Sequence, residues 1–378
     1  MIPTECRFAT PSDRDAILRF GERLAAGNVA NKLALLALDP ALPGENGEVS
    51  PAIRRRSLVA LDGEEIRATQ LFFEHEMYIH GEPNSFIWPA GPISESKMDL
   101  KYALFSVVLL KHSLSLQPLH MALGLGSYEH TMARIFVALG WKHDRVPFFF
   151  YPVRPYRVLR EIKAFDSKYR RIAASLMAYS GMGWLGGFIF CHSRRLRNST
   201  GLCATENMDR FGEWTDETWE KCHSSYGALT RRDKAALNTF YAPGDKRYHR
   251  LRVQRNGEYI GWILVTMRDM ENDKHFGNLR VGTLVDGLCV PEDAQDVMSA
   301  GLRYLIGEKV DICIANWSHI AWRTASRKLG FLQGPSNFIY FVSQAGTPPL
   351  LIEDCPLEQI HLSRGDGDGP IHLVPDDL

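Results

Sequence analysis

Apolar and polar positions alternate in two similar stretches of the chain. Residues 55–73 read RRSLVALDGEEIRATQLFF, and residues 249–266 read HRLRVQRNGEYIGWILVT. In each stretch, Asp-Gly or Asn-Gly separates two runs, and such pairs supply the positive φ angles of a two-residue turn. Both stretches therefore predict β-hairpins, with turns at Asp62-Gly63 and Asn256-Gly257. The two turn glycines lie 194 residues apart.

After each hairpin the pattern predicts a strand, a helix, a second strand and a helix that ends in Leu-Gly-aromatic. The pieces in the first half are SFIWPAG, KYALFSVVLLKH, PLHMALGLG and YEHTMARIFVALGW. Those in the second half are GTLVDGLCV, DVMSAGLRYLIGEK, VDICIANWS and HIAWRTASRKLGF. Each half closes with a further apolar strand, at 146–151 and at 337–343. The same ordered set of elements twice predicts a tandem repeat.

Helix-start signals agree with this order. Ser12 with Asp15, and Thr230 with Asp233, form capping signals before apolar residues at helical spacing. Each half then has the order helix, hairpin, strand, helix, strand, helix, strand. The predicted fold class is α/β, with two tandem domains that each hold a mixed, mostly antiparallel sheet flanked by helices. We expect domains at 1–152 and 201–345, a basic and apolar helical connector at 153–200, and an acidic tail at 346–378.

Composition narrows the class of protein. The chain has 378 residues, with 44 Lys+Arg and 44 Asp+Glu. This balance gives no reason to expect DNA binding. The seven cysteines are scattered without a CxxC pair, which excludes a disulfide framework or a zinc ribbon and favours a reducing cytoplasm. The start of the chain has no signal-peptide pattern.

The connector carries a local charge imbalance. Ten Lys or Arg residues lie between Arg154 and Arg197, against Glu161 and Asp166. Within it, residues 172–191 are uncharged, but four glycines make them too weakly apolar for a membrane span. Two interpretations remain: a helical element packed between the domains, or a peripheral contact of residues 154–197 with anionic lipid. RNA contact is not expected, because no RNA-binding motif accompanies the charges.

The element order resembles the GNAT fold, the family of acetyl-CoA-dependent N-acetyltransferases. FATPSDRDAILRF is similar to the family's first strand and helix, and ASRKLGF and IFVALGW are similar to its last-helix ending. RRDKAALNTFYAPGDKRYHRLRVQRNGEYIGWILV resembles the entry to the second unit of tandem GNAT-like proteins from bacterial polysaccharide and secondary-metabolite pathways. The resemblance implies acetyl-CoA or another acyl-CoA as the donor, and it implies no metal.

The chain departs from the family at the loop that binds the donor's pyrophosphate. Residues 290–297 read VPEDAQDV, with three acids and no glycine, and residues 91–98 read GPISESKM. The cofactor-binding candidates are Leu288 and Val290 in the second half and, in the first half, Ser94, Ser96 and Lys97. The position of the family's general-acid Tyr holds Phe136 in one half and Ser326 in the other.

Asp286 is the candidate general base, because it lies within an otherwise apolar strand and a buried carboxylate must be paired or functional. Ser318 and His319 follow the next strand as candidate acid or base groups, with Asn316 and Trp317 as substrate-binding candidates. A structural Asp and a capped helix start are the alternative interpretations.

In the first half, the equivalent strand-end cluster is Ser127, Tyr128, Glu129 and His130. Ser127 and Tyr128 are the substrate-binding candidates, and a capped helix start is the alternative interpretation of the cluster. Glu74 and Glu76 alternate with His75 along a strand, which favours a solvated strand face over a metal site. No metal site is predicted.

The leading hypothesis is therefore an acyltransferase that moves an acyl group, with acetyl as the first candidate, from acyl-CoA to an amine or hydroxyl of a small molecule. An amino sugar is one candidate acceptor. We expect one domain, the second, to hold the reaction. Two alternatives stay open: a catalytically silent tandem protein that binds or scaffolds, and a tRNA-dependent aminoacyl transferase.

Overall fold

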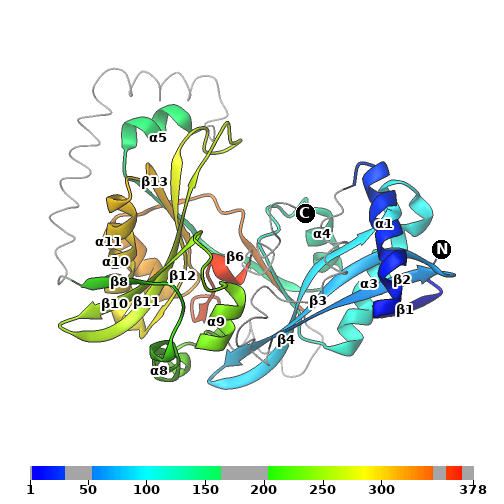
Figure 1. The fold of residues 1–378 in the computed structure, drawn as a ribbon, viewed down its shortest axis with the longest axis horizontal. Coiled ribbons are helices and arrows are strands. Elements are labelled where there is room, and N and C mark those ends of the chain that lie inside the picture. The colour runs from blue at the N-terminus through cyan, green and yellow to red at the C-terminus, as the bar shows by residue number, and fades with distance from the viewer. Residues whose placement is uncertain (1, 30–52, 163–202, 344–354, 368–378) are drawn as a thin grey trace.

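The computed structural model describes residues 2–29, 53–162, 203–343 and 355–367. Both halves contain the predicted order of elements (Figure 1). The first half comprises β1 (Glu5–Phe8), α1 (Arg14–Ala26), β2 (Arg54–Asp62), β3 (Glu65–Ile79), β4 (Glu82–Ser94), α3 (Ala103–Leu116), β5 (Met121–Leu123), α4 (Thr131–Ala138), β6 (Lys142–Arg145) and β7 (Phe148–Pro152). The helix α5 (Pro155–Glu161) follows.

The second half comprises β8 (Ala204–Met208), α8 (Glu213–Cys222), β9 (Ala228–Thr230), α9 (Lys234–Phe240), β10 (Tyr248–Arg255), β11 (Glu258–Asp269), β12 (Arg280–Cys289), α10 (Ala294–Gly307), β13 (Ile312–Asn316), α11 (Ile320–Leu329), β14 (Leu332–Gly334) and β15 (Ile339–Val342). The described part of the tail adds the short strand β16 (Ile360–His361) and a single 3-10 turn at Arg364–Asp366.

The observed hairpin turns and helix ends confirm some of the predicted positions and correct others. Asn256 and Gly257 both have positive φ, at 54° and 85°, as the predicted turn requires. The first hairpin turns one residue later than predicted, at Gly63 and Glu64, because Asp62 already pairs with Glu65. The helix-ending signal holds, since Gly330 adopts the left-handed conformation that ends α11, and φ is positive for Gly140 after α4.

The helix starts differ from the predicted caps. At the first helix the reciprocal capping pair is Thr10 with Asp13, two residues before Ser12 and Asp15. Before α9 the cap is Asp233, whose carboxylate accepts from Ala236 N at 2.7 Å. Thr230 instead lies in β9 and turns its hydroxyl to the tail.

Helices cover both faces of the first sheet. Alternate residues of β2 point to opposite faces. Leu58 and Ala60 lie in one apolar cluster with Phe105 of α3, whereas Val59 and Leu61 pack with Phe20 of α1. In the second half, α10 packs across β11 and β12. A Cβ on Gly301 of α10 would come within 2.9 Å of Leu284, so this contact needs glycine.

The closing strands of the two halves are exchanged. β7, from the first half, lies between β13 and β14 of the second half and is antiparallel to both. β15, from the second half, lies between β5 and β6 of the first half and is also antiparallel to both. The sequence predicts both strands but not this exchange of partners. Neither half therefore completes its own sheet.

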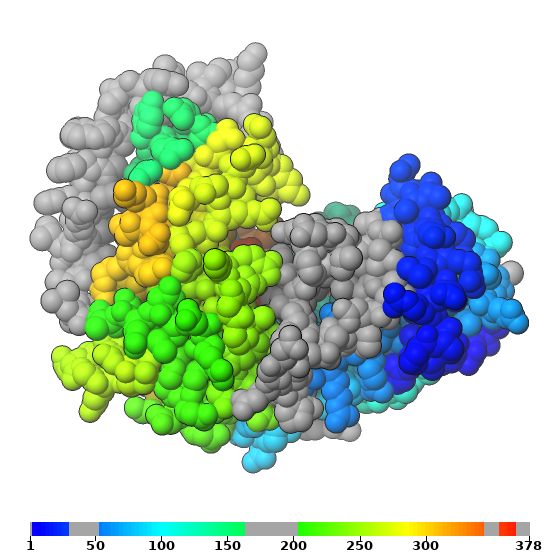
Figure 2. Space-filling view, viewed as in Figure 1, coloured from blue at the N-terminus to red at the C-terminus, as the bar shows by residue number. Residues whose placement is uncertain are grey.

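Further contacts join the halves beyond the exchange. β9 pairs with the far end of β3, and β16 pairs with β9, so second-half and tail residues extend the first sheet. Phe240 of α9 stacks on Phe73 of β3 with 6.1 Å between ring centroids. In the space-filling view the halves form two lobes, blue to cyan and green to orange (Figure 2). The red tail lies between the halves in Figure 1.

The predicted connector falls mostly outside the described residues. Its start forms α5, and Arg154 and Arg157 both donate to the buried carboxylate of Asp311, at 3.2 and 3.0 Å. In the described ranges no helix is long and apolar enough to cross a membrane. The uncharged segment 172–191 lies outside those ranges, and the peripheral membrane contact stays a prediction.

The strand exchange makes a prediction about unfolding. Phe149 of β7 is buried in the apolar cluster that holds the second half's core and part of the first, and Phe341 of β15 is buried in the first half's core. We expect one cooperative transition, which both Phe149→Ala and Phe341→Ala shift, because each substitution removes a buried aromatic ring at a cost of roughly 3–5 kcal/mol. Calorimetry together with circular dichroism would measure this. Leu332→Ala, at a 38 % exposed position, is the control. Two separate transitions, each moved by one variant only, would contradict the shared fold.

Acid stability depends on a histidine buried where the halves meet. His75 of β3 is 1 % exposed, and its ring lies 4.8 Å from that of Phe240. Neither ring nitrogen has a hydrogen-bond partner among the described residues. Burial, aided by Arg232 and Arg231, lowers the pKa of His75 to about 3 from its usual 6.5. Between pH of about 3 and 6.5, the unfolded chain therefore binds a proton at His75 that the folded protein does not bind. The stability of the folded protein consequently falls as the pH drops below about 6.5.

We expect His75→Phe to remove this contribution. Between pH 7 and pH 5, the unfolding free energy of the wild-type protein should decrease by about 2 kcal/mol more than that of His75→Phe. Urea denaturation at the two pH values measures the difference, and His275→Phe, at an exposed position, should behave as the wild type. An equal decrease in His75→Phe would show that this histidine does not carry the effect.

Candidate functional site

In the second half, two adjacent parallel strands diverge. β12 and β13 pair only from Val281 with Ile312 to Leu284 with Ala315. The pairing of β12 with β11 shifts at Val285, which is a bulge, and β12 then continues to Cys289 away from β13. The predicted candidates Asp286, Leu288, Asn316 and Trp317 all lie at or beyond this divergence.

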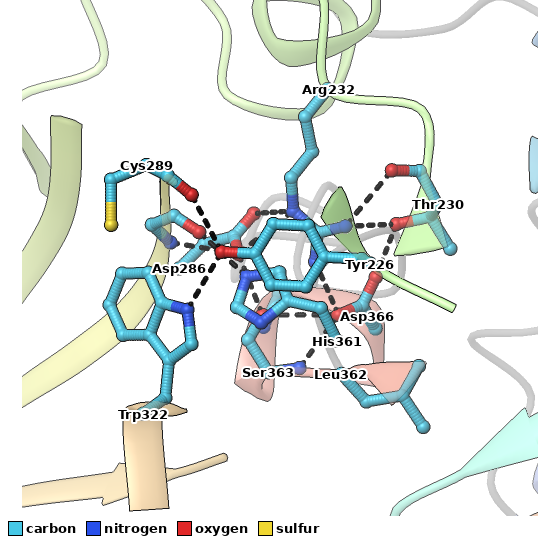
Figure 3. Close-up of polar contacts among 12 residues, drawn as sticks. Tyr226, Thr230, Arg232, Asp286, Cys289, Trp322, His361, Leu362, Ser363 and Asp366 are labelled. Atoms are coloured by element: carbon cyan, nitrogen blue, oxygen red, sulfur yellow. Dashed lines mark hydrogen bonds and ion pairs between the residues drawn. The ribbon is translucent and has the colours of Figure 1, made fainter. Parts of the chain in front are cut away.

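The tail fills the gap between the two strands (Figure 3). His361 donates from Nε2 to Gly287 O of β12 at 2.8 Å. On the β13 side, Ser318 N donates to Leu362 O at 3.0 Å, and Trp317 forms an isolated bridge with Ser363. The His361 side chain and the tail backbone therefore bond the backbone of the two strand ends.

A buried ion-pair cluster fastens the tail in place (Figure 3). The guanidinium of Arg232 donates to both Asp286 oxygens at 3.1 Å and to Asp366 at 2.6 Å. Ser363 Oγ and Gly287 N also donate to Asp286, at 2.8 and 2.9 Å. Burial raises the pKa of Asp286 to about 6, and Arg232 opposes this shift. The carboxylate is therefore buried and bonded to Arg232, Gly287 N and Ser363, as the structural interpretation of this Asp expects.

The other second-half candidates also have structural partners. Ser318 Oγ bonds Ile360 O and accepts from Leu362 N. His319, not Ser318, caps α11, since its Nδ1 accepts from Ala321 N at 3.3 Å, and burial lowers its pKa to about 4. Asn316 donates to Pro147 O and accepts from Arg364, at 3.2 and 2.9 Å. Trp317 is fully buried and stacks on Trp322 with 4.5 Å between ring centroids.

The second half's phosphate-loop position is acidic and occupied by its own ion pairs. Leu288 is fully buried on β12, and Val290 precedes the 3-10 turn Pro291–Asp293. Asp293 and Asp296 both accept from Arg255, at 2.6 and 2.9 Å. Acids at this helix start and a gap filled by the tail do not fit a phosphate-bearing donor.

In the first half, the equivalent pair of strands also diverges, but here the gap is a cavity. β4 and β5 meet only at Ile87, which bridges His120 and donates to Leu119 O at 2.9 Å. Beyond Ile87, no described strand pairs with β4 on the side that faces β5. The cavity between them has a volume of about 320 Å³.

The wall of the cavity is mostly apolar. It is formed by residues 88–93 of β4, by Ala122, Leu123 and Leu125 on and after β5, by His130, Met132 and Phe136 at α4, by Arg55, Leu71 and Phe73 of β2 and β3, and by Gly367 of the tail. Among these described residues, Arg55 is the only charged side chain. His130 caps α4, with Nδ1 accepting from Met132 N at 3.3 Å.

The first half's cofactor-binding candidates lie where β4 leads into α3. Ser94 Oγ accepts from Ser96 N at 3.4 Å, at the start of a 3-10 turn, and Lys97 is exposed. Glu95 between them is buried and salt-bridged to Arg23 and Arg67, at 2.6 and 2.9 Å. The negative charge of this loop is therefore compensated from within the protein, and Lys97 faces solvent at the end of the strand that walls the cavity.

The predicted substrate-binding residues of the first half lie near the cavity but not on its wall. Ser127 Oγ accepts from Glu129 N at 3.0 Å, just before α4. The hydroxyl of Tyr128 bonds His143 at 3.3 Å on the outer side of α4, and Arg145 lies 4.9 Å above its ring. In the described ranges no group of three or more His, Cys, Asp or Glu is arranged to hold a metal ion.

Of the residues that line the cavity, sequence reasoning placed His130 in the strand-end cluster and missed Arg55. His130 had a signal: it lies 189 residues before His319, at the same place in the repeat. Arg55 is hidden within Arg54-Arg55-Arg56, which is typical of an exposed strand edge. Only the period-2 alternation of the hairpin, in which Arg55 shares a face with the buried Ser57 and Val59, indicates that the middle arginine points inward.

Comparisons with known proteins bear on the fold. No family model matches the chain, and no curated protein matches its sequence. Its structure is similar to a GCN5-related N-acetyltransferase from Anabaena variabilis ATCC 29413, with a TM-score of 0.54, 8 % identity, and coverage of 91 % of this chain and 74 % of that one. It is also similar to a conserved protein of unknown function from Enterococcus faecalis V583 described as a probable N-acyltransferase, with a TM-score of 0.52, 8 % identity, and coverage of 90 % and 73 %. The chain therefore has the fold of the GCN5-related N-acetyltransferases.

Proposed function

We propose that the chain is an acyltransferase that binds an acyl-thioester donor, acyl-CoA, between β4 and β5 of its first half. The acyl group would pass to an amine or hydroxyl of a small molecule in the same cavity, and an amino sugar is one candidate. The observation that carries the proposal is the contrast between the two gaps. Equivalent strands diverge in both halves. Among the described residues the tail fills the gap in the second half, and the gap in the first half holds a cavity of about 320 Å³, within the range of small-molecule sites.

The residues around the first gap fit such a donor. Its phosphates would meet Ser94, Ser96 and Lys97 at the end of β4, where Arg23 and Arg67 compensate Glu95. Beyond Ile87, the free edge of β4 offers backbone groups that must find partners when water is excluded. Pro89 and Pro92 lack N–H groups, so this part of β4 has more backbone acceptors than donors. These acceptors suit a chain that carries amide N–H groups.

The chemistry requires a nucleophile, a proton acceptor and a stabilised carbonyl. The bound donor supplies a thioester carbonyl carbon, to which the acceptor's nitrogen or oxygen bonds as the carbon–sulfur bond breaks. The acceptor gives up one proton, and the sulfur leaves as the thiol. His130 is the polar side chain at α4 that lines this space. Because its Nδ1 accepts from Met132 N, the neutral ring carries its proton on Nε2 and offers a hydrogen-bond donor.

The second half would then support the site rather than hold it. Asp286, Ser318 and His319 stay predictions as catalytic residues, and their described partners are Arg232, the tail and the start of α11. We propose that the first two hold the tail, whose Gly367 reaches the cavity wall. A Cβ at Gly367 would come within 2.5 Å of Phe338, so the tail packs closely there.

Donor binding tests the proposal. Ala90 is half-buried on β4 and lines the cavity, so Ala90→Trp should fill the space without disturbing the core. We expect calorimetric titration to show micromolar binding of acetyl-CoA or a longer acyl-CoA to the wild-type protein, and binding at least roughly tenfold weaker to Ala90→Trp, since an indole ring excludes the ligand sterically. Ala25→Trp, on the exposed side of α1, is the matched control and should bind normally.

Two results would count against this assignment. Unchanged binding by Ala90→Trp, at unchanged thermal stability, would place the donor outside the first-half cavity. Absence of binding by the wild-type protein to every acyl-CoA would overturn the donor itself and favour the binding or scaffold hypothesis.

A further inference from the structure

The first half exposes apolar side chains next to the loop that would meet the donor's phosphates. Leu100 is 83 % exposed, and Leu104 and Met98 are 51 % and 39 % exposed. Leu100 begins the 3-10 turn that leads into α3, so Leu100 and Leu104 are neighbours one helical turn apart. Met98 directly follows Lys97 of the loop. Met98, Leu100 and Leu104 are called the α3 patch below.

The helix behind this patch lacks the charged outer face of an ordinary surface helix. Its inner face packs Phe105 and Leu109 against the first sheet. By the 3.6-residue period, Leu104 and Val107 share the outward face, and Lys111 is the only Lys, Arg, Asp or Glu in α3. Surface helices normally carry charged residues on that side. An exposed apolar patch of this kind is typical of a surface that a partner covers.

The charges around the patch favour an acidic protein as that partner. Lys97, Lys101 and Lys111 are exposed. Lys101 is paired with Asp99 at 3.0 Å, whereas Lys97 has no acidic partner among the described residues. An apolar centre with a weakly basic rim complements a protein surface that carries acids around an apolar centre. Anionic membranes attract segments with about 4–8 Lys or Arg, more than this rim provides.

The phosphate loop provides little charge for a nucleotide. Glu95 is buried and bonded to Arg23 and Arg67, so Lys97 is the loop's own cation. CoA carries a pyrophosphate and a further phosphate on its ribose, whereas a phosphopantetheine arm attached to a protein carries a single phosphodiester. In the proposed orientation of the donor, on which this inference rests, Lys97 suffices to balance that phosphodiester. The α3 patch begins one residue later, where the protein that bears the arm would lie.

We infer that the preferred donor is an acyl thioester on the phosphopantetheine arm of a small acidic carrier protein, and that this protein docks on the α3 patch. The arm enters between β4 and β5, as proposed for CoA. The acceptor's nitrogen or oxygen bonds to the thioester carbon, and the carbon–sulfur bond breaks. The acceptor loses one proton, and the sulfur remains on the carrier as a thiol.

The test compares three donors that carry the same acyl group. They are acyl-CoA, acyl-phosphopantetheine, and a bacterial fatty-acid acyl carrier protein loaded with that group. Calorimetric titration of the full chain gives the affinity for each donor and needs no acceptor. We expect acyl-phosphopantetheine to bind with an affinity similar to that of acyl-CoA, because the nucleotide finds few partners. The loaded carrier should bind at least about tenfold more tightly, because it also covers the α3 patch.

Variants assign the carrier's advantage to the patch. Leu100→Glu and Leu104→Glu should each weaken carrier binding by about tenfold or more, because a carboxylate removes apolar contact and repels an acidic partner. Neither residue lines the cavity, so binding of acyl-phosphopantetheine should stay unchanged. Leu116→Glu, at a 46 % exposed position at the far end of α3, is the matched control and should bind the carrier as the wild type does. Thermal unfolding of each variant separates loss of binding from loss of fold.

The outcomes separate this inference from the proposed function. Acyl-CoA binding about tenfold tighter than acyl-phosphopantetheine would show that the nucleotide is recognised, and would overturn the inference while the acyltransferase stands. Carrier binding no tighter than that of acyl-phosphopantetheine, or an advantage that survives in both Leu100→Glu and Leu104→Glu, would overturn the role of the patch.

A membrane is the competing occupant. Sedimentation with vesicles of phosphatidylglycerol and phosphatidylcholine tests it, and vesicle binding that Leu100→Glu abolishes would assign the patch to lipid and overturn the carrier. Absence of binding to all three donors would overturn the proposed function itself.

Discussion

The exchange of β7 and β15 is the constraint on which the rest of the structure depends. Each strand supplies the middle of a ladder whose outer strands belong to the other half. β5 walls the cavity, and its only described antiparallel partner is β15, which arrives from residue 339 onward. The first half's cavity is therefore shaped by backbone hydrogen bonds from the second half. A change in how the halves meet would move a wall of the cavity without touching a residue that lines it.

The two halves share one architecture, but the gap between their diverging strands differs: among the described residues the tail fills it in the second half, and a cavity lies there in the first. In both halves a parallel pair of strands separates and exposes backbone groups that need partners. In the second half the tail provides these partners, and the buried ion pairs of Arg232 with Asp286 and Asp366 hold it in place. Those charges are fully buried and bonded to one another. Removal of the tail would therefore leave charges without their partners in an apolar interior. In the first half, Gly367 is the residue of the described tail that lines the gap, and the cavity there is formed mostly by apolar side chains.

The sequence predicted what depends on local chemistry. Alternation and turn residues located both hairpins, and Leu-Gly-aromatic located the ends of α4 and α11. It could not predict the exchange, because β7 (FFFYP) and β15 (IYFV) are both short aromatic runs with no feature that selects a partner. Asp286 was correctly expected to be buried or paired, but the sequence did not show its connection through Arg232 to Asp366, which lies 80 residues later in the tail. Arg55 was missed because a run of three arginines is typical of an exposed strand, whereas the two-residue period of the strand places the middle arginine on the buried face.

His130 and His319 show most directly why local sequence does not decide function here. Both cap the helix that follows the diverging strands, and both accept a backbone N–H on Nδ1 at 3.3 Å. His319 is 7 % exposed and lies against Tyr226, with 4.7 Å between ring centroids. His130 lines the cavity and is exposed. Among the described residues, the same capping device is buried where the tail fills the gap and lines a cavity in the other half. The surroundings of the two histidines therefore differ because the buried ion pairs of Arg232 hold the tail against the second half.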